Sequence, residues 1–139
     1  VERKLGYWVE QVEIQARAVD ALATWAEGNR AGGIAQLRLA ATREDATEKH
    51  AVVPGPLLPA RELLAALLVE SGAVAEGLAE YEATLAKEPN RLRAVLGAAQ
   101  AAERAGDPVK SKRYAAQAAE LTRQAQPGRA EIARVVKGS

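Results

Sequence analysis

The sequence contains no cysteine, no methionine and no phenylalanine, and it has a single histidine. Without cysteine the chain has neither disulfide bonds nor a thiol nucleophile. No apolar run approaches 18 residues, so we expect a soluble chain without a membrane-spanning helix. Methionine is missing from position 1 as well, which indicates a fragment or processed piece of a longer protein. Any targeting signal would then lie outside the sequence, and the compartment stays unknown.

A charge excess of one sign is also lacking. The 19 basic and 18 acidic side chains leave a net charge of +1, whereas nucleic-acid binders concentrate basic residues on one face. Lys110, Lys112 and Arg113 cluster, and we interpret them as a solvated helix face. We therefore predict no nucleic-acid partner and no membrane partner.

Sequence motifs of catalysis are missing too. The chain has no Walker-type phosphate loop, no recognisable Ser/His/Asp set and no paired metal-ligand motif. Asp45, Glu48 and His50 are the one group that suggests a metal or a general base, but a metal site usually needs two or more His or Cys ligands. A histidine near a helix C-terminus is the simpler interpretation. We predict a protein that is not an enzyme and has no metal or cofactor, and a metal-dependent activity remains a minor alternative.

The features that are present are helical. Alanine, the best helix former, makes up roughly a quarter of the chain, and no alternating β-branched run bounded by turns appears. Proline excludes a helix across Pro54-Gly55-Pro56. The breakers predict seven helices, at about 7–26, 31–46, 59–71, 74–87, 92–105, 108–125 and 129–136.

A glycine recurs together with similar flanking residues. Gly72 and Gly106 lie 34 residues apart, and Gly28 has similar flanking residues. Each is predicted to form the turn between two helices. The residue seven positions earlier is always alanine, and the residue five positions later is always small: Gly33, Gly77 and Ser111. Small residues recur where two helices cross closely. This period, with one helix pair in each repeat, is typical of stacked α-helical repeats.

The first interval, from Gly28 to Gly72, is 44 residues long. About ten extra residues therefore separate the first two repeats. We predict an insertion at about 44–57 that lies at one edge of the stacked repeats. The whole of 1–139 is predicted to be one domain, with repeats at about 14–43, 58–91 and 92–125 and a C-terminal capping helix at about 127–137.

These repeats resemble the tetratricopeptide repeat family, over about residues 14–124. The unit 58–91 carries Ala65, Gly77, Tyr81 and Pro89 at the family's small, small, aromatic and proline positions. The third unit departs from the pattern, since its aromatic residue is one position early and no proline closes it. The first unit has an aspartate at position 20, where leucine is usual. The stretch from about 44 to 63 is also similar to the C-terminal repeat region of longer bacterial tetratricopeptide proteins.

The resemblance implies an all-α, right-handed α-solenoid of three helix pairs, in which the first helix of each pair lines a concave groove. A peptide or partner domain would bind there, and an extended or helical peptide with hydrophobic anchors fits a groove of mixed charge. The alternative is a structural repeat segment that serves homo-oligomerisation or intramolecular packing. The groove positions that we select as partner-binding residues are Trp25, Glu62, Val69, Glu70, Arg93, Leu96, Gln100 and Arg104.

Two alternatives stay open for the tryptophans. Trp25 is a binding hot spot if it faces the groove, and it belongs to the core if it packs on the second helix. Trp8 precedes the repeats and is predicted to cover the open end of the stack or to contact an upstream domain. Leu121, Ile132 and Val135 are predicted to cover the other end.

Overall fold

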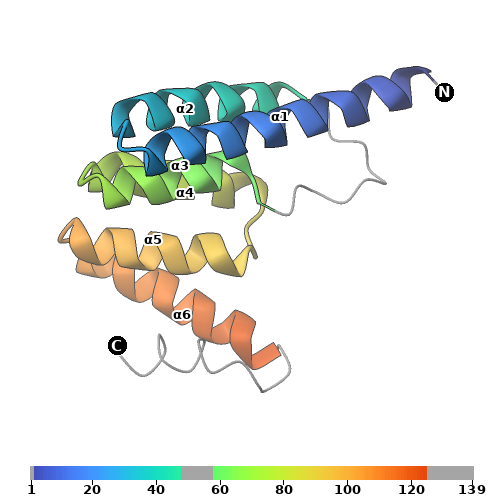
Figure 1. Cartoon of the computed structure of the whole chain (residues 1–139). Coiled ribbons are helices and arrows are strands. Elements are labelled where there is room, and N and C mark those ends of the chain that lie inside the picture. The colour runs from blue at the N-terminus through green and yellow to red at the C-terminus, as the bar shows by residue number, and fades with distance from the viewer. Residues whose placement is uncertain (1, 48–57, 125–139) are drawn as a thin grey trace.

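The computed structural model describes residues 2–47 and 58–124, and these residues form an all-α structure without strands. Six helices are present in these two ranges (Figure 1). They are α1 (Glu2–Ala26), α2 (Arg30–Ala46), α3 (Ala60–Glu70), α4 (Val74–Lys87), α5 (Leu92–Arg104) and α6 (Pro108–Gln124). The predicted all-α class is therefore confirmed.

The helix boundaries follow the predicted ones closely, with one exception. The bounds of α4 are those predicted, and the ends of α2, α3, α5 and α6 differ from prediction by one residue. Helix α1 begins at Glu2 instead of Tyr7, because residues 2–5 are good helix formers and include no proline. The predicted C-terminal helix, with Ile132 and Val135, and the residues Glu48 and His50 lie outside the described ranges.

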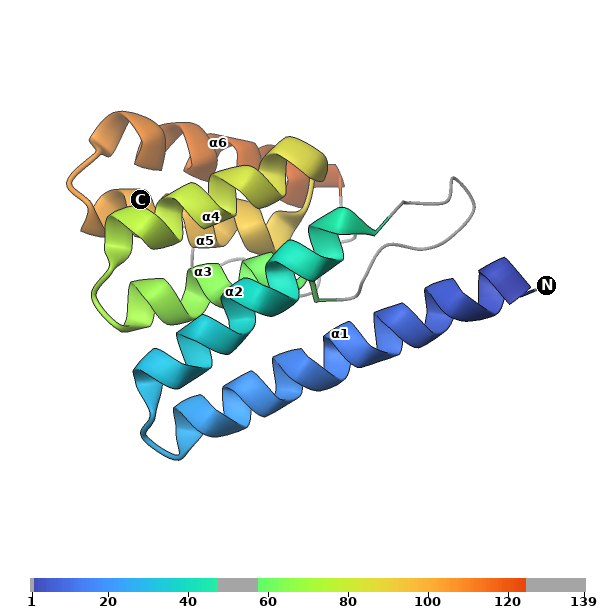
Figure 2. The same ribbon diagram turned by 90° about the horizontal axis from the view of Figure 1, so that it is seen from above.

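The helices form antiparallel pairs that follow one another in chain order. Helix α1 packs on α2, α3 on α4 and α5 on α6, while α2 also contacts α3 and α4 contacts α5. Smaller contacts join α1 to α3 and α3 to α5. Seen from above, α1 lies at one edge of this arrangement and extends beyond the end of α2 (Figure 2). No described helix is both long enough and apolar enough to cross a membrane.

Glycine forms the turn within each pair, as the sequence predicts. Gly28, Gly72 and Gly106 have φ values of 96°, 94° and 74°, in the left-handed region that only glycine adopts without strain. At the first turn the Asn29 amide donates to the Thr24 carbonyl, and at the third the Asp107 amide donates to the Ala102 carbonyl. These bonds satisfy carbonyls that a helix end would otherwise leave open.

The core consists of two clusters that the middle pair connects. The first joins α1, α2 and α3 around Ile14, Leu37 and Leu64. The second joins α4, α5 and α6 around Val95 and Tyr114 and includes many alanines. Small side chains such as these let helices approach one another closely.

The two helices of a pair cross where the sequence places its small residues. A Cβ atom on Gly33 would lie 2.8 Å from the Ala21 carbonyl oxygen, and one on Gly77 would lie 2.9 Å from the Ala65 carbonyl oxygen. Backbone therefore contacts backbone at both crossings. Gly33 and Gly77, two of the three recurring small residues identified in the sequence, mark these crossings, and a methyl group at either position would force the two helices apart.

We predict that Gly77→Ala lowers the free energy of unfolding by about 1–3 kcal/mol, the cost of overpacking a fixed contact. Alanine improves helix propensity, but its Cβ would meet the Ala65 backbone oxygen and the Val69 side chain. The matched control is Gly6→Ala in α1, where no atom lies within 4 Å of the added Cβ and stability should rise by about 0.5–1 kcal/mol. Urea unfolding followed by circular dichroism tests both variants, and equal effects would contradict this account of the crossing.

Candidate functional site

A hollow opens where α3, α4 and α5 meet, with a volume of about 330 Å³. Its lining residues are Ala66, Val69, Glu70, Tyr81, Gly97, Gln100 and Arg104. Four of them, Val69, Glu70, Gln100 and Arg104, belong to the groove residues predicted from the sequence. The structure brings these four together from two helices that are separate in the chain.

Each wall of the hollow follows from helical spacing. Val69 and Glu70 end α3 and stand one turn after Ala66, while Gln100 and Arg104 lie four residues apart on α5. Residues at this spacing share one face of a helix. The first helices of the second and third pairs thus present these faces to the same space.

The floor of the hollow is a contact that sequence reasoning missed. The Tyr81 ring, from α4, lies directly over Gly97 of α5, and even a methyl group at position 97 would overlap the ring. Tyr81 is buried with the second core cluster, and we had assigned it only as the family's aromatic position. The available signal was Gly97 itself, because a glycine inside a helix lowers stability unless something packs closely against it.

Charges of both signs lie at the rim. Glu70 and Arg104 are exposed, and neither forms an ion pair within residues 2–47 and 58–124. At the floor, burial raises the pKa of the Tyr81 hydroxyl, and the negative Glu62 raises it further. The phenol is therefore neutral at physiological pH and can donate a hydrogen bond. The hollow combines an apolar floor with one available cation, one available anion and the Gln100 amide.

Glu62 and Arg93 are placed differently from the prediction. Glu62 is only 1% exposed. Its carboxylate forms ion pairs with two arginines, Arg91 and Arg93, and the Arg93 Nε lies 2.8 Å from Glu62 Oε1. A buried carboxylate requires such partners. Helical periodicity gives the direction of a side chain, but it did not show that the start of α5 covers Glu62. Glu62, predicted as a groove contact, thus forms ion pairs inside the structure that join α3 to the start of α5. Arg93 takes part in one of these ion pairs and is itself exposed.

Trp25 and Leu96 pack against the core with part of their surface exposed. Trp25 packs at the periphery of the first cluster. It lies so close to Gly33 of α2 that a Cβ atom added there would be 2.9 Å from the Trp25 Cβ. The Arg30 guanidinium, also on α2, lies 5.2 Å from the centroid of the Trp25 ring. These contacts with α2 favour the core interpretation of Trp25 over the groove interpretation. Leu96 packs on the second cluster. Neither residue lines the hollow.

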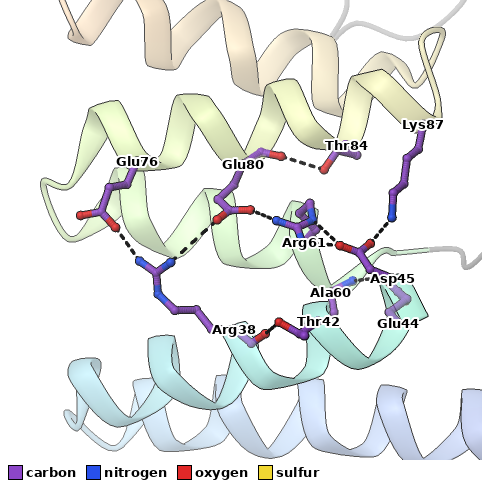
Figure 3. A network of polar contacts seen from close by, with 10 residues as sticks. All are labelled: Arg38, Thr42, Glu44, Asp45, Ala60, Arg61, Glu76, Glu80, Thr84 and Lys87. Carbon is purple, nitrogen blue, oxygen red and sulfur yellow. Dashed lines mark hydrogen bonds and ion pairs between the residues drawn. The ribbon is translucent and has the colours of Figure 1, made fainter. Parts of the chain in front are cut away.

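Asp45, the described member of the suggested metal group, takes part in a network of ion pairs (Figure 3). Its carboxylate binds Arg61 of α3 and Lys87 of α4, and Arg61 also binds Glu80. Residues 44–46 form the last turn of α2, in agreement with the helix predicted over about 31–46. They overlap the start of the insertion predicted at about 44–57, of which residues 48–57 lie outside the described ranges. No group of three or more potential metal ligands was found among the described residues.

The neighbouring Glu44 fastens the start of α3. Its Oε2 accepts a hydrogen bond of 2.8 Å from the Ala60 amide, which is the first residue of that helix. Pro59 precedes it and provides no side-chain cap. The first amides of a helix lack partners within the helix, so α2 supplies the cap that the local sequence lacks. Glu44 and Asp45 therefore join the first pair to the second.

The pKa of Asp45 reflects two opposing effects. Partial burial raises it, but hydrogen bonds from Lys87 and Arg61 outweigh burial and hold the pKa below its ordinary value of 3.8. Because the folded pKa is depressed, the stabilising contribution of Asp45 is fully present above the ordinary pKa. It is lost as the pH falls through the folded pKa.

We predict that Asp45→Asn destabilises the fold by about 1 kcal/mol at neutral pH, as expected for a partly exposed carboxylate with two cations. The difference from the natural chain should be constant above the ordinary aspartate pKa and should shrink below it. Urea unfolding across an acid pH series provides the measurement. Glu27→Gln is the control, because Glu27 is exposed and forms no ion pair in the described part of the chain. A constant difference at every pH would contradict the assigned role.

Comparisons with known proteins add no family to this description. No protein-family model matches the sequence, and no curated protein matches it either. The hollow between α3, α4 and α5 is the candidate site.

Proposed function

We propose that the chain is a non-catalytic protein–protein interaction module of the tetratricopeptide type, which binds a peptide of a partner protein in the hollow between α3, α4 and α5. The observation that carries this proposal is the composition of the hollow. Ala66, Val69 and the Tyr81 ring provide an apolar floor, and Glu70 and Arg104 provide opposite charges at the rim. A volume of about 330 Å³ lies at the small end of the range of ligand pockets.

The proposal includes the fold of the family, a right-handed α-solenoid of three helix pairs. Its support is the register of the sequence together with the contacts between successive pairs. In such an arrangement first helices line one face, and the hollow is lined by α3 and α5, the first helices of their pairs. The bound peptide would lie across α3 and α5, with an apolar anchor over Tyr81.

The rim charges indicate which peptides fit. An acidic side chain on one side of the anchor would meet Arg104, and a basic side chain on the other would meet Glu70. Both charges are exposed, so they contribute mainly to the choice and orientation of the peptide and less to its affinity. An acidic tail with a terminal carboxylate fits poorly, because Glu70 would repel it.

We predict that the full chain selects, from an immobilised library of short peptides, sequences with an apolar anchor between an acidic and a basic residue. Arg104→Glu should weaken the selected peptides by about tenfold, equivalent to about 1.4 kcal/mol. Exchanging the acidic residue of the peptide for lysine should restore binding to this variant. Fluorescence anisotropy with labelled peptides measures each affinity.

Lys112→Glu is the matched control, because Lys112 is exposed on α6, away from the hollow, and the charge change is the same. It should leave the affinity unchanged. Peptides that bind Arg104→Glu and Glu70→Lys as well as the natural chain would place the binding site elsewhere. A chain that selects no peptide would contradict the proposed module.

A further inference from the structure

The outward side of α1 has no helix packed against it among the described residues. Helix α3 contacts α2 and α4, and α5 contacts α4 and α6. Helix α1 packs on α2, has a smaller contact with α3, and lies at one edge of the arrangement (Figure 2). Its open side nevertheless carries apolar residues, since Val12 is 67% exposed and Val19 is 64% exposed. Val12, Ala16, Val19 and Ala23 follow the spacing of one helix face, and we refer to these four residues as the outer face of α1.

The repeat register shows what this face corresponds to in the second pair. Ala16, Val19 and Ala23 occupy the positions of Ala60, Leu63 and Leu67 on α3. Those three α3 residues are at most 8% exposed and belong to the cluster that joins α3 to the first pair. The surface that α3 buries against the preceding pair is therefore the surface that α1 exposes.

The third pair repeats this correspondence. The equivalent positions on α5 are Ala94, Gly97 and Ala101, and both alanines are fully buried. Gly97, the counterpart of Val19, lies under the Tyr81 ring of α4. In both later pairs, then, the counterpart of the outer face is buried, by the first pair at α3 and by the Tyr81 ring of α4 at Gly97.

Charges at the edge of the face follow the same register. Arg17 occupies the position of Arg61, which binds Asp45 in the last turn of α2. Arg17 is exposed and forms no ion pair in the described part of the chain. Its position corresponds to an ion pair whose acidic member would come from the covering helix.

Asp20 adds a second charge to the same surface. Its counterparts, Leu64 and Ala98, are buried, whereas Asp20 is exposed. A carboxylate at the centre of a helix contact requires a cation or a polar group opposite it. A purely apolar covering helix would leave Asp20 without a partner.

We propose that the outer face of α1 docks an amphipathic helix of a partner protein. That helix has the chemistry of α2, with an apolar stripe of small residues and a carboxylate in its last turn that binds Arg17. It also carries a basic residue near its middle that faces Asp20. This surface is separate from the hollow, and the inference does not depend on the proposed peptide function.

A second copy of the chain supplies this chemistry poorly. Among the described helices, α6 is the second helix of the last pair and has no further pair after it. In the repeat register, Arg123 of α6 occupies the position of Asp45 of α2. Stacking α6 on α1 would therefore bring Arg123 toward Arg17, two cations that repel each other. Charge complementarity thus argues against α6 of a second copy as the occupant.

The test is a selection of displayed amphipathic helices against the full chain, with an apolar stripe fixed and all other positions randomised. Enriched helices should carry an acidic residue in the last turn and a basic residue near the middle. Val19→Asp should weaken them by at least about tenfold. Arg17→Glu should weaken them less, and exchanging the acidic residue of the helix for lysine should restore the affinity.

Two control variants make the result specific. Leu39→Asp changes another exposed apolar residue, on α2, and should not change binding, nor should Arg104→Glu at the hollow. Circular dichroism should show that Val19→Asp melts like the natural chain, because its side chain is exposed. Selection of no helix, or of helices that tolerate Val19→Asp, would overturn the proposal. Dimerisation of the chain alone that Val19→Asp abolishes would show that a second copy is the occupant.

Discussion

The arrangement depends on one constraint, the close crossing of the two helices within a pair. Gly33 faces the Ala21 backbone and Gly77 faces the Ala65 backbone, with no room for a Cβ atom. The glycine turns bring each second helix back along the first, and the crossing then fixes how closely the two can lie. Because the helices of the first two pairs approach so closely, each of these pairs forms one thin layer. Its two sides are left for contacts with the pairs before and after it.

Polar groups at the helix ends set how one pair meets the next. Glu44 caps α3, Asp45 binds Arg61 and Lys87, and the buried Glu62 holds the start of α5 through Arg91. Ion pairs that are partly exposed contribute about 0–1 kcal/mol each, while each fully buried leucine or valine contributes about 1.5–3 kcal/mol. Stability therefore comes mainly from the apolar clusters. The ion pairs favour one relative position of the pairs, because sliding one pair along the other would break several of them together.

Local signals were enough to predict the helices, the left-handed glycines and the small residues at the crossings. Each depends on a few neighbouring residues, such as a glycine after a helix or a proline in its first turn. The features that sequence reasoning missed depend on contacts between distant segments. Tyr81 covers Gly97 from another helix, the start of α5 buries Glu62, and Asp45 at the end of α2 binds Arg61 of α3 and Lys87 of α4. Of the predicted groove residues, those at the end of α3 and along α5 meet at the hollow, while Trp25 packs on α2.

The same register explains why the hollow lies at the second junction. Position by position, Val69 corresponds to Trp25 in the first pair, and Gly97 corresponds to Leu63 in the second. The α1–α3 junction therefore carries large apolar residues at positions where the α3–α5 junction carries valine and glycine. Trp25 packs at the periphery of the first core cluster, whereas the shorter Val69 lines the hollow. The Tyr81 ring covers Gly97 and forms the floor. The exchange of tryptophan for valine between successive repeats thus leaves room beside Val69, at the junction where the candidate binding site lies.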